Sequence, residues 1–270
     1  MLKQRILTAT VLIGLILAIL FLLPPIAFTL FTVLLLGFAG WEWSHIMGFT
    51  HKGQRIFYVM LMILVMIGVG LVPAQQVLLL SLFGWIIALY CVISYGRNGR
   101  YKAESKFFKG LAGIFVLAPC WLGLNVLRIR DHGAILVLLV FLIVWMADTA
   151  AYFVGRRFGQ HKLLERVSPG KTIEGAIAAM LGSLILSLTF LVLLLPQSNM
   201  YEAALFIILV MITAFFSIVG DLFKSVLKRQ QNLKDSGNIL PGHGGILDRI
   251  DSLTAAAPIF ALGILFLGIG

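Results

Sequence analysis

Residues 225–251 read SVLKRQQNLKDSGNILPGHGGILDRID, and this polar stretch separates two apolar runs near residues 202–223 and 250–269. Its middle, at 241–245, combines proline with glycines, which disfavour a regular helix because proline lacks a backbone donor and glycine loses the most conformational freedom. Each flanking run has the roughly 20 residues that a helix needs to cross a bilayer. The pattern therefore predicts a polar loop between two membrane spans.

The rest of the chain repeats this alternation of long apolar runs and short polar breaks. Of the 270 residues, 60% are hydrophobic and only 12% charged, with a mean hydropathy of +1.03, whereas soluble domains carry about 25% charged residues. We therefore predict an all-α, polytopic integral membrane protein. About nine transmembrane helices are expected, near residues 6–23, 26–44, 56–73, 76–96, 107–127, 133–155, 172–195, 202–223 and 250–269.

The first run could be a signal peptide, but it is long for one and lacks a small-x-small cleavage site before Pro24, so we interpret it as a retained span. With nine spans, all of the 21 Lys and Arg residues except Arg128 and Arg130 fall on one side of the membrane. The positive-inside rule then predicts a cytoplasmic N-terminus and an external C-terminus. The net charge of +10 is explained by these loops, so no nucleic-acid partner is expected.

Two acidic residues fall within or beside apolar runs. Asp148 lies inside the sixth span, where a carboxylate costs about 2.5–3.5 kcal/mol at the bilayer centre. Such groups are usually functional, although a hydrogen bond to a neighbouring helix would also explain it. Asp148, Tyr152 and Arg156 recur at a spacing of four and so share one helix face. Glu42, between two tryptophans, is expected at the membrane interface.

The seventh span is preceded by Ser168-Pro169-Gly170-Lys171-Thr172. Gly-Lys-Thr also occurs in phosphate-binding P-loops, but the earlier glycine of that motif is replaced by Glu165. We instead expect a helix start with Ser168 as N-cap, where backbone amides and Lys171 could bind an anion. An ordinary capped helix with an orienting lysine is the alternative.

The eighth span ends with polar residues at helical spacing. Ser217, Asp221 and Ser225 fall on one stripe, and Lys224 and Lys228 fall on an adjacent one. A metal-binding aspartate flanked by phosphate-binding lysines fits this pattern. An Asp–Lys pair of little energetic value at the interface is the alternative.

The ninth span begins with Asp248 and Asp251, three residues apart and therefore on one helix face. Two such carboxylates repel each other unless a cation lies near them, although acids are also favoured at helix N-termini. His243 is a candidate phosphate contact or acid, or simply a turn residue. Cys91 and Cys120 lie in apolar runs and give no zinc site, so oxygen-bound Mg²⁺ (or Mn²⁺) is the expected ion.

The candidate acidic and basic residues of spans six to nine all fall toward the expected cytoplasmic ends of those spans. A cation, phosphate-binding bases and access to lipid suit phosphoryl or nucleotidyl transfer to a lipid phosphate, which depends mainly on positioning and charge neutralisation. Another lipid-phosphate transferase, such as a CDP-alcohol phosphotransferase, is an alternative, but the Asp-Gly-x-x-Ala-Arg core of that family is absent. An ion or lipid transporter is the other alternative, although the sequence shows no internal repeat.

The polar stretch also carries a resemblance. It contains Ser225-x-Leu227-Lys228-Arg229, Lys234-Asp235-x-Gly237 and Leu240-Pro241-x-His243-Gly244-Gly245-Ile246-x-Asp248-Arg249-Ile250-Asp251. In this order it resembles the signature of bacterial phosphatidate cytidylyltransferases (CDP-diacylglycerol synthases). Further similar segments are Met1–Lys3, Phe21–Pro25, Trp41–Trp43 and Ser168–Thr172, so the resemblance covers nearly the whole chain.

The resemblance implies that a phosphatidate oxygen attacks the α-phosphorus of CTP, giving CDP-diacylglycerol and pyrophosphate. It implies Mg²⁺ at Asp221 and Asp248, which we extend to Asp251 and Asp148, and a homodimer in the bacterial inner membrane with its site facing the cytoplasm. Residues 1–130 would be a scaffold with possible dimer contacts, and residues 131–270 would carry the site. The expected catalytic residues are Asp221, Asp248, Asp251, Lys228 and His243. The expected substrate-binding residues are Ser168, Lys171, Lys224, Ser225, Arg229, Lys234 and Arg249.

Overall fold

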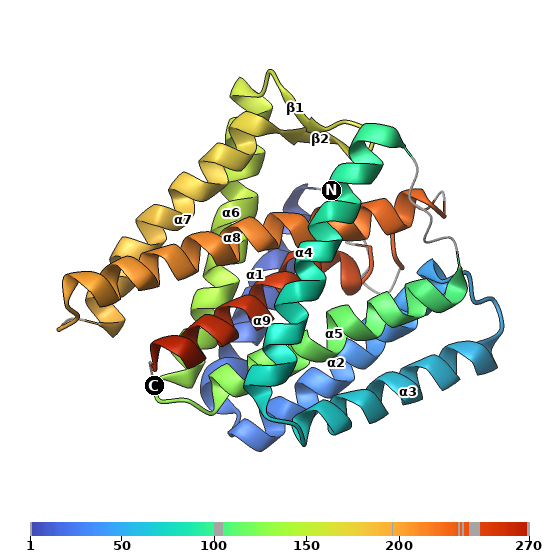
Figure 1. Cartoon of the computed structure of the whole chain (residues 1–270), viewed down its shortest axis with the longest axis horizontal. Coiled ribbons are helices and arrows are strands. Elements are labelled where there is room, and N and C mark those ends of the chain that lie inside the picture. The colour runs from blue at the N-terminus through green and yellow to red at the C-terminus, as the bar shows by residue number, and fades with distance from the viewer. Residues whose placement is uncertain are drawn as a thin grey trace.

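A computed structural model describes residues 2–99, 105–195, 197–231, 233, 235–237 and 244–268. Within these residues the chain forms helices and one two-stranded hairpin (Figure 1). The elements, in chain order, are α1 (Leu2–Leu22), α2 (Pro25–Ile46), α3 (Lys52–Gly70), α4 (Ala74–Asn98), α5 (Lys106–Arg128), α6 (Gly133–Phe158), β1 (Lys162–Leu164), β2 (Ser168–Thr172), α7 (Ile173–Leu194), α8 (Met200–Arg229) and α9 (Leu247–Leu267).

The helices of the described chain correspond one to one with the predicted spans. Eight of them, α2 to α9, are long and apolar enough to cross a membrane, and α1 contributes a shorter apolar segment, Ile13–Leu22. The predicted all-α, polytopic membrane architecture is confirmed. The number of helices that cross the bilayer and the side on which the N-terminus lies stay predictions.

The centre of the fold is α9, which packs against α4, α5, α6 and α8 (Figure 1). Its middle residues, from Ser252 to Leu262, are all buried. Small residues allow the close contacts: a Cβ at Gly123 of α5 would lie 2.9 Å from the carbonyl oxygen of Ala257. Because α9 is enclosed in this way, its N-terminal end has a fixed position relative to its neighbours.

The outer helices present apolar side chains away from the protein. On α3 these include Phe57, Met60 and Leu64, and on α7 they include Leu181 and Ile185. Large contiguous apolar surfaces of this kind are rare in soluble monomers. They are the surfaces that lipid tails would cover.

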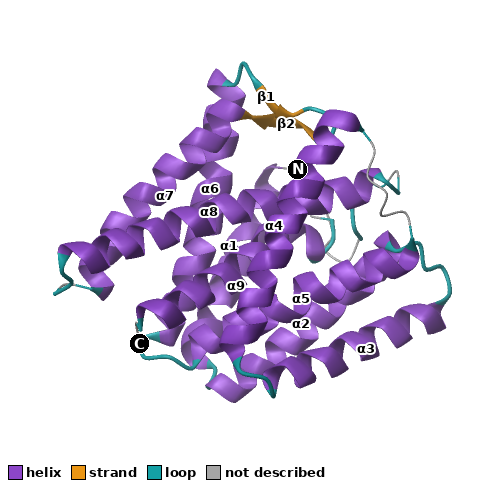
Figure 2. Cartoon of the chain, in the orientation of Figure 1, coloured by secondary structure: helices purple, strands orange, loops and turns teal. Residues whose placement is uncertain are grey.

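The hairpin between α6 and α7 was not predicted (Figure 2). Strand β1 pairs antiparallel with β2, with Lys162 opposite Thr172 and Leu164 opposite Ser168. The expectation that Ser168 caps a helix is therefore wrong. The N-cap of α7 is Thr172, whose hydroxyl accepts a hydrogen bond from the Gly175 amide at 3.1 Å, because the intervening residues continue the strand.

Helix α8 continues to Arg229, beyond the expected span end at residue 223, and Lys224, Ser225 and Lys228 lie in its last two turns at the helical spacing that the sequence indicated. Helix α5 begins at Lys106, and Lys109 in its first turn is only 1% exposed. This charge, which neighbouring helices enclose, was not singled out from the sequence.

Candidate functional site

A pocket of about 220 Å³ lies between α6, α7, α8 and the hairpin. Asp148 on α6, Lys171 on β2 and Asp221 on α8 line it, together with small and apolar residues. Asp148 is exposed at the protein surface. It lies close enough to Lys171 and Asp221 to interact with them electrostatically. Three residues predicted separately from the sequence are thus brought together.

The polar face of α6 continues toward the end of that helix. Tyr152, one turn after Asp148, also lines the pocket, and its hydroxyl accepts a hydrogen bond from Arg156 Nη1 at 2.8 Å. The spacing of four that predicted a shared face is confirmed. This face carries the Asp148 carboxylate at the pocket and the Arg156 guanidinium about two turns nearer the end of α6.

Lys171 and Asp221 form an ion pair, with 2.7 Å between Nζ and Oδ2. Their side chains are 26% and 27% exposed, so the pair remains accessible from the pocket. The hairpin places Lys171 here because β2 runs directly into α7, which packs against both α6 and α8. A substrate phosphate entering the pocket would therefore meet an ammonium group and a carboxylate together.

A second, more enclosed cluster joins α8 to α9. Lys224 is 3% exposed, and its Nζ donates to Asp248 Oδ1 at 2.9 Å and to Asp251 Oδ2 at 2.5 Å. Lys224 also donates to the carbonyl oxygen of Leu247 at 3.2 Å. One buried ammonium group thus neutralises two carboxylates that would otherwise repel each other.

Asp248 is held by four donors. Its Oδ1 accepts from Lys224 and from Lys228 Nζ at 3.0 Å, and its Oδ2 accepts from the amides of Ser236 at 2.9 Å and Gly245 at 3.2 Å. Gly244 has φ +79°, a conformation that a residue with a side chain rarely adopts. The glycine-rich approach to α9 therefore shapes a cradle around one carboxylate.

The two clusters meet where α8 crosses α9. A Cβ on Gly220 would lie 2.7 Å from the carbonyl oxygen of Asp251, so only glycine permits this approach. The carboxyl groups of Asp221 and Asp251 are consequently close enough to interact electrostatically. The site is continuous from Lys171 through Asp221 and Asp251 to Lys224.

Glu42 is the residue that sequence reasoning missed. It is 1% exposed and therefore enclosed by protein rather than by lipid or water, while its depth in the membrane stays a prediction. Its Oε1 accepts from the Ile246 amide at 3.0 Å, and its Oε2 accepts from the Leu247 amide at 2.8 Å and from Ser236 Oγ at 3.2 Å. The one sequence signal was a charged residue between two tryptophans in an apolar run, which does not reveal partners about 200 residues away.

The remaining predicted residues lie around this centre with weaker contacts. Ser225 Oγ lies 3.5 Å from Asp221 Oδ1, one turn along α8, and Arg229 Nε lies 3.5 Å from the Val167 carbonyl oxygen in the hairpin. Ser168 is in β2, and Arg249 is exposed in the first turn of α9. Two predicted residues, Lys234 and His243, lie outside the described residues.

The described residues contain no group of three or more His, Cys, Asp or Glu side chains arranged to hold a metal ion. Magnesium, however, is commonly held by only one or two protein carboxylates together with substrate phosphates. The adjacent carboxylates of Asp221 and Asp251, with Asp148 in the same pocket, are oxygen donors of the kind this ion takes. The donor set therefore fits magnesium.

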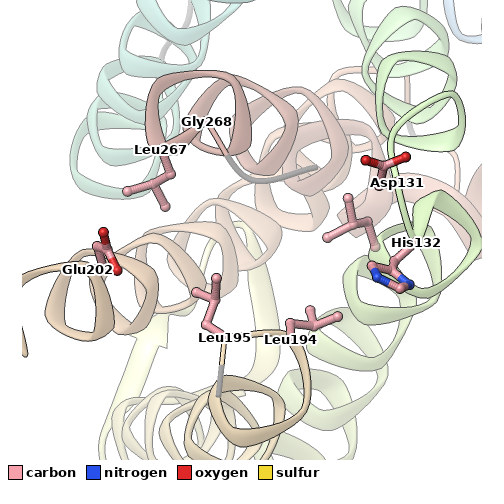
Figure 3. Close-up of a pocket in the computed structure, with 8 residues that line it drawn as sticks. Asp131, His132, Leu194, Leu195, Glu202, Leu267 and Gly268 are labelled. Carbon is pink, nitrogen blue, oxygen red and sulfur yellow. The ribbon is translucent and has the colours of Figure 1, made fainter. Parts of the chain in front are cut away.

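A second pocket of about 310 Å³ lies at the opposite ends of the helices (Figure 3). Asp131, His132 and Glu202 contribute to it, with Leu194 and Leu267 among its apolar residues. The Glu202 carboxylate accepts from the Asn199 amide in the capping box that begins α8, which is a structural role. No lysine or arginine is among its described lining residues, so it lacks the cations that suit phosphate.

Comparisons with known proteins relate the whole chain to one group. Residues 3–267 match the model of a protein family described as the Cytidylyltransferase family. The chain is 40% identical over 265 residues to the phosphatidate cytidylyltransferase of Pseudomonas aeruginosa, covering 97% of this chain and 96% of the relative. It is 38% identical to that of Haemophilus influenzae, covering 97% and 98%, and 34% identical to that of Thermotoga maritima, covering 77% of each.

Proposed function

The chain belongs to the Cytidylyltransferase family, and we infer from this and from its site that it is a phosphatidate cytidylyltransferase. It transfers CMP from CTP to phosphatidate, giving CDP-diacylglycerol and pyrophosphate in phospholipid biosynthesis. The near-complete coverage of its relatives means that all the helices that build the site are included in the match. The inference also accounts for an ionic site at the ends of apolar helices.

The observation that carries this function is the continuous cluster of lysines and carboxylates from Lys171 to Lys228. CTP brings a triphosphate and phosphatidate brings a phosphomonoester, so their negative charges must be neutralised before they can approach. In the proposed reaction, a phosphatidate oxygen forms a bond to the CTP α-phosphorus while the bond from that phosphorus to the β-phosphate oxygen breaks. The electron pair of the broken bond leaves with pyrophosphate, so the protein supplies position and charge rather than a nucleophile.

Lys171 at the pocket and Lys228 beside Asp248 are the proposed phosphate contacts, with Arg229 and Arg249 at the exposed rim. Lys224 has a different role because it is enclosed between two carboxylates. It neutralises Asp248 and Asp251 and holds the two carboxylates in place. This division separates residues that bind substrate from one that maintains the site.

We propose that magnesium is the cofactor. It would be held by Asp221 together with Asp248 or Asp251 from α9, and Asp148 lies near enough to the pocket to contribute an oxygen or a bound water. When bound, the ion would neutralise the phosphate oxygens of CTP. Manganese would serve in the same place because it accepts the same oxygen ligands.

The protein is a multi-pass membrane protein, and we propose the bacterial inner membrane, with the site at the cytoplasmic face. Support comes from the distribution of Lys and Arg, which gathers nearly all basic residues at the helix ends that build the site. CTP is a cytoplasmic nucleotide, so this face supplies it directly. A homodimer, with contacts from residues 1–130, stays a proposal.

The test is pyrophosphate release by the purified protein in detergent with phosphatidate, Mg²⁺ and each nucleoside triphosphate in turn. We expect release with CTP and formation of CDP-diacylglycerol, both strongly reduced in Asp221→Asn at the same Mg²⁺ concentration. If none of the nucleoside triphosphates supports pyrophosphate release by protein shown to be folded and monodisperse, the proposed function is overturned. Vectorial ion or lipid flux in proteoliposomes without turnover would instead favour a transporter.

A further inference from the structure

We propose that Glu42 on α2 is a positioning residue for Asp248, acting through the backbone segments that both carboxylates bind. The inference rests on the proposed cytidylyl transfer. It gives the N-terminal helices a defined part in the reaction, because Glu42 is contributed by the half of the chain that was predicted to be a scaffold.

The contacts of Glu42 converge on two short segments. Oε1 and Oε2 accept the amides of Ile246 and Leu247 at 3.0 and 2.8 Å, at the beginning of α9, where free amides favour a negative group. Oε2 also accepts from Ser236 Oγ at 3.2 Å. A buried carboxylate with three donors therefore joins the end of α2 to the start of α9 and to residue 236.

Asp248 binds the same two segments from the other side. Its Oδ2 accepts from the amides of Ser236 and Gly245. Glu42 contacts Ser236 as well, and it contacts Ile246, the residue after Gly245. Ser236 thus donates its hydroxyl to Glu42 and its amide to Asp248. Any shift of residues 244–247 or of Ser236 changes where Asp248 meets Lys224 and Lys228.

The space around Glu42 is shaped for its side chain. A Cβ on Gly237 would lie 2.5 Å from Glu42 Oε1, and one on Gly245 would overlap Oε2. Both positions accept only glycine while Glu42 is in place. The polar stretch thus forms a close-fitting enclosure around a carboxylate from a helix far away in sequence.

The end of α2 is itself anchored, so Glu42 has a fixed position. Trp43 Nε1 donates to the Lys109 carbonyl oxygen on α5 at 2.8 Å, and Arg55 on α3 donates to the Trp41 carbonyl oxygen at 2.9 Å. The Arg55 guanidinium also stacks 4.0 Å from the centre of the Trp41 ring. Misplacements of about 1 Å can cost roughly 100-fold in rate, so a fixed anchor for the Asp248 segment matters to the reaction.

The experiment measures kcat and KM for CTP in wild type, Glu42→Gln, Asp248→Asn and the double variant, all as full-length protein in detergent. Gln keeps the shape of Glu but replaces one acceptor oxygen with a donor that faces backbone amides. We expect kcat to fall about 10- to 100-fold with KM for CTP changed less than about 3-fold. The double variant should be no slower than Asp248→Asn, because Glu42 acts through Asp248.

Two further variants separate positioning from folding. Glu202→Gln changes another carboxylate at a helix N-terminus, at the opposite end of α8, and should leave kcat unchanged, since Gln also serves in a capping box. Ser236→Ala removes only the hydroxyl bonded to Glu42 and keeps the amide bonded to Asp248. It should lower kcat about 3- to 10-fold with an unchanged thermal midpoint, which keeps the test valid if Glu42→Gln is unstable.

The proposal is overturned if Glu42→Gln and Ser236→Ala both retain wild-type kcat. It is also overturned if the Glu42 and Asp248 effects multiply in the double variant, because independent effects would exclude action through Asp248. These results differ from failure of the proposed function itself. In that case the wild-type protein would release no pyrophosphate with CTP, and the inference would fall with it.

Discussion

Lys171 Nζ lies 2.7 Å from Asp221 Oδ2, so an ion pair joins the end of the hairpin to the middle of the site. Both side chains are about one-quarter exposed, and ion pairs with access to water contribute little to stability. The pair is better explained by a role in binding the substrate phosphate and a metal ion. It holds an ammonium group and a carboxylate at the pocket, where a phosphate and a metal ion would each find a partner.

Replacing Lys171 should therefore affect catalysis much more than stability. For Lys171→Met we expect kcat/KM for CTP to fall roughly 10- to 150-fold, the equivalent of one hydrogen bond to a charged group, about 1.5–3 kcal/mol. The thermal midpoint should stay close to that of wild type. The measurement is steady-state pyrophosphate release combined with thermal unfolding in the same detergent.

Lys162→Met is the matched control for this prediction. Lys162 is on the other strand of the same hairpin, is exposed, and donates to the Pro169 carbonyl oxygen at 2.8 Å. Its loss should change kcat/KM less than about 3-fold. Equal losses in the two variants would show that hairpin integrity, rather than the Lys171 charge, determines activity.

Lys224 should behave in the opposite way. Lys224→Met leaves Asp248 and Asp251 without their shared buried cation, and breaking a buried pair in this manner costs about 3–5 kcal/mol. At about 2–4 °C per kcal/mol, the thermal midpoint should fall by roughly 6–20 °C. Adding Asp251→Asn should recover part of the loss, because Asp248 still pairs with Lys228, whereas the ion pair of Asp251 in the described residues is with Lys224 alone.

Thermal unfolding of the single and double variants in detergent tests this assignment. If Lys224→Met unfolds at the wild-type temperature, the ammonium group does not stabilise the α8–α9 contact. Activity is not expected to return in the double variant, since Asp251 belongs to the site. The distinguishing result is a double variant that regains thermal stability but not activity.

The sequence predicted the helices better than the segments that connect them. Spans were located from hydropathy because each one must be apolar for about 20 residues in a bilayer. The expected eighth span ended at residue 223, before the charged Lys224, Lys228 and Arg229, although the helical spacing of Lys224 and Lys228 indicated that the helix continues. Within the fold, these two lysines face carboxylates of α9.

The hairpin and Glu42 depend on tertiary contacts that one sequence does not display. Residues 162–172 have no alternating apolar pattern, and the hairpin is fixed by contacts such as Arg166 Nη1 to the Arg97 carbonyl oxygen at 2.8 Å. The side chain of Val167 is fully buried between the strands and the helices. The candidate acids and bases were found because charges are conspicuous in apolar segments, but their pairing required the helix crossings.

Gly220 sets one of these crossings and gives a stability prediction of its own. In Gly220→Ala the new Cβ would lie 2.7 Å from the Asp251 carbonyl oxygen and 3.1 Å from Ala255 Cβ, so α8 and α9 must separate. Overpacking of this kind costs about 1–3 kcal/mol. We expect a lower thermal midpoint and at least a 10-fold loss of kcat, because Asp221 and Asp251 move apart.

Gly68→Ala provides the comparison, since a Cβ at Gly68 of α3 has no neighbour within 4 Å. Alanine is also the better helix former by roughly 1 kcal/mol. This variant should keep wild-type activity and an equal or higher midpoint. A similar loss in both variants would mean that any glycine in these spans is needed for folding, irrespective of its contacts.

The carboxylates make a prediction about magnesium. Removal of divalent ions with EDTA should abolish pyrophosphate release, and Mg²⁺ or Mn²⁺ should restore it. Asp221→Asn should raise the Mg²⁺ concentration for half-maximal rate at least 10-fold, because Asp221 lies beside both the pocket and Asp251. Comparing Asp248→Asn with Asp251→Asn identifies which carboxylate of α9 shares the ion. Loss of a metal ligand should raise the Mg²⁺ concentration for half-maximal rate. Loss of a purely structural residue should lower only the maximal rate. A half-saturating Mg²⁺ concentration that is unchanged in all three variants would place the ion on the CTP phosphates alone, and the aspartates would then act only on the lysines that face them.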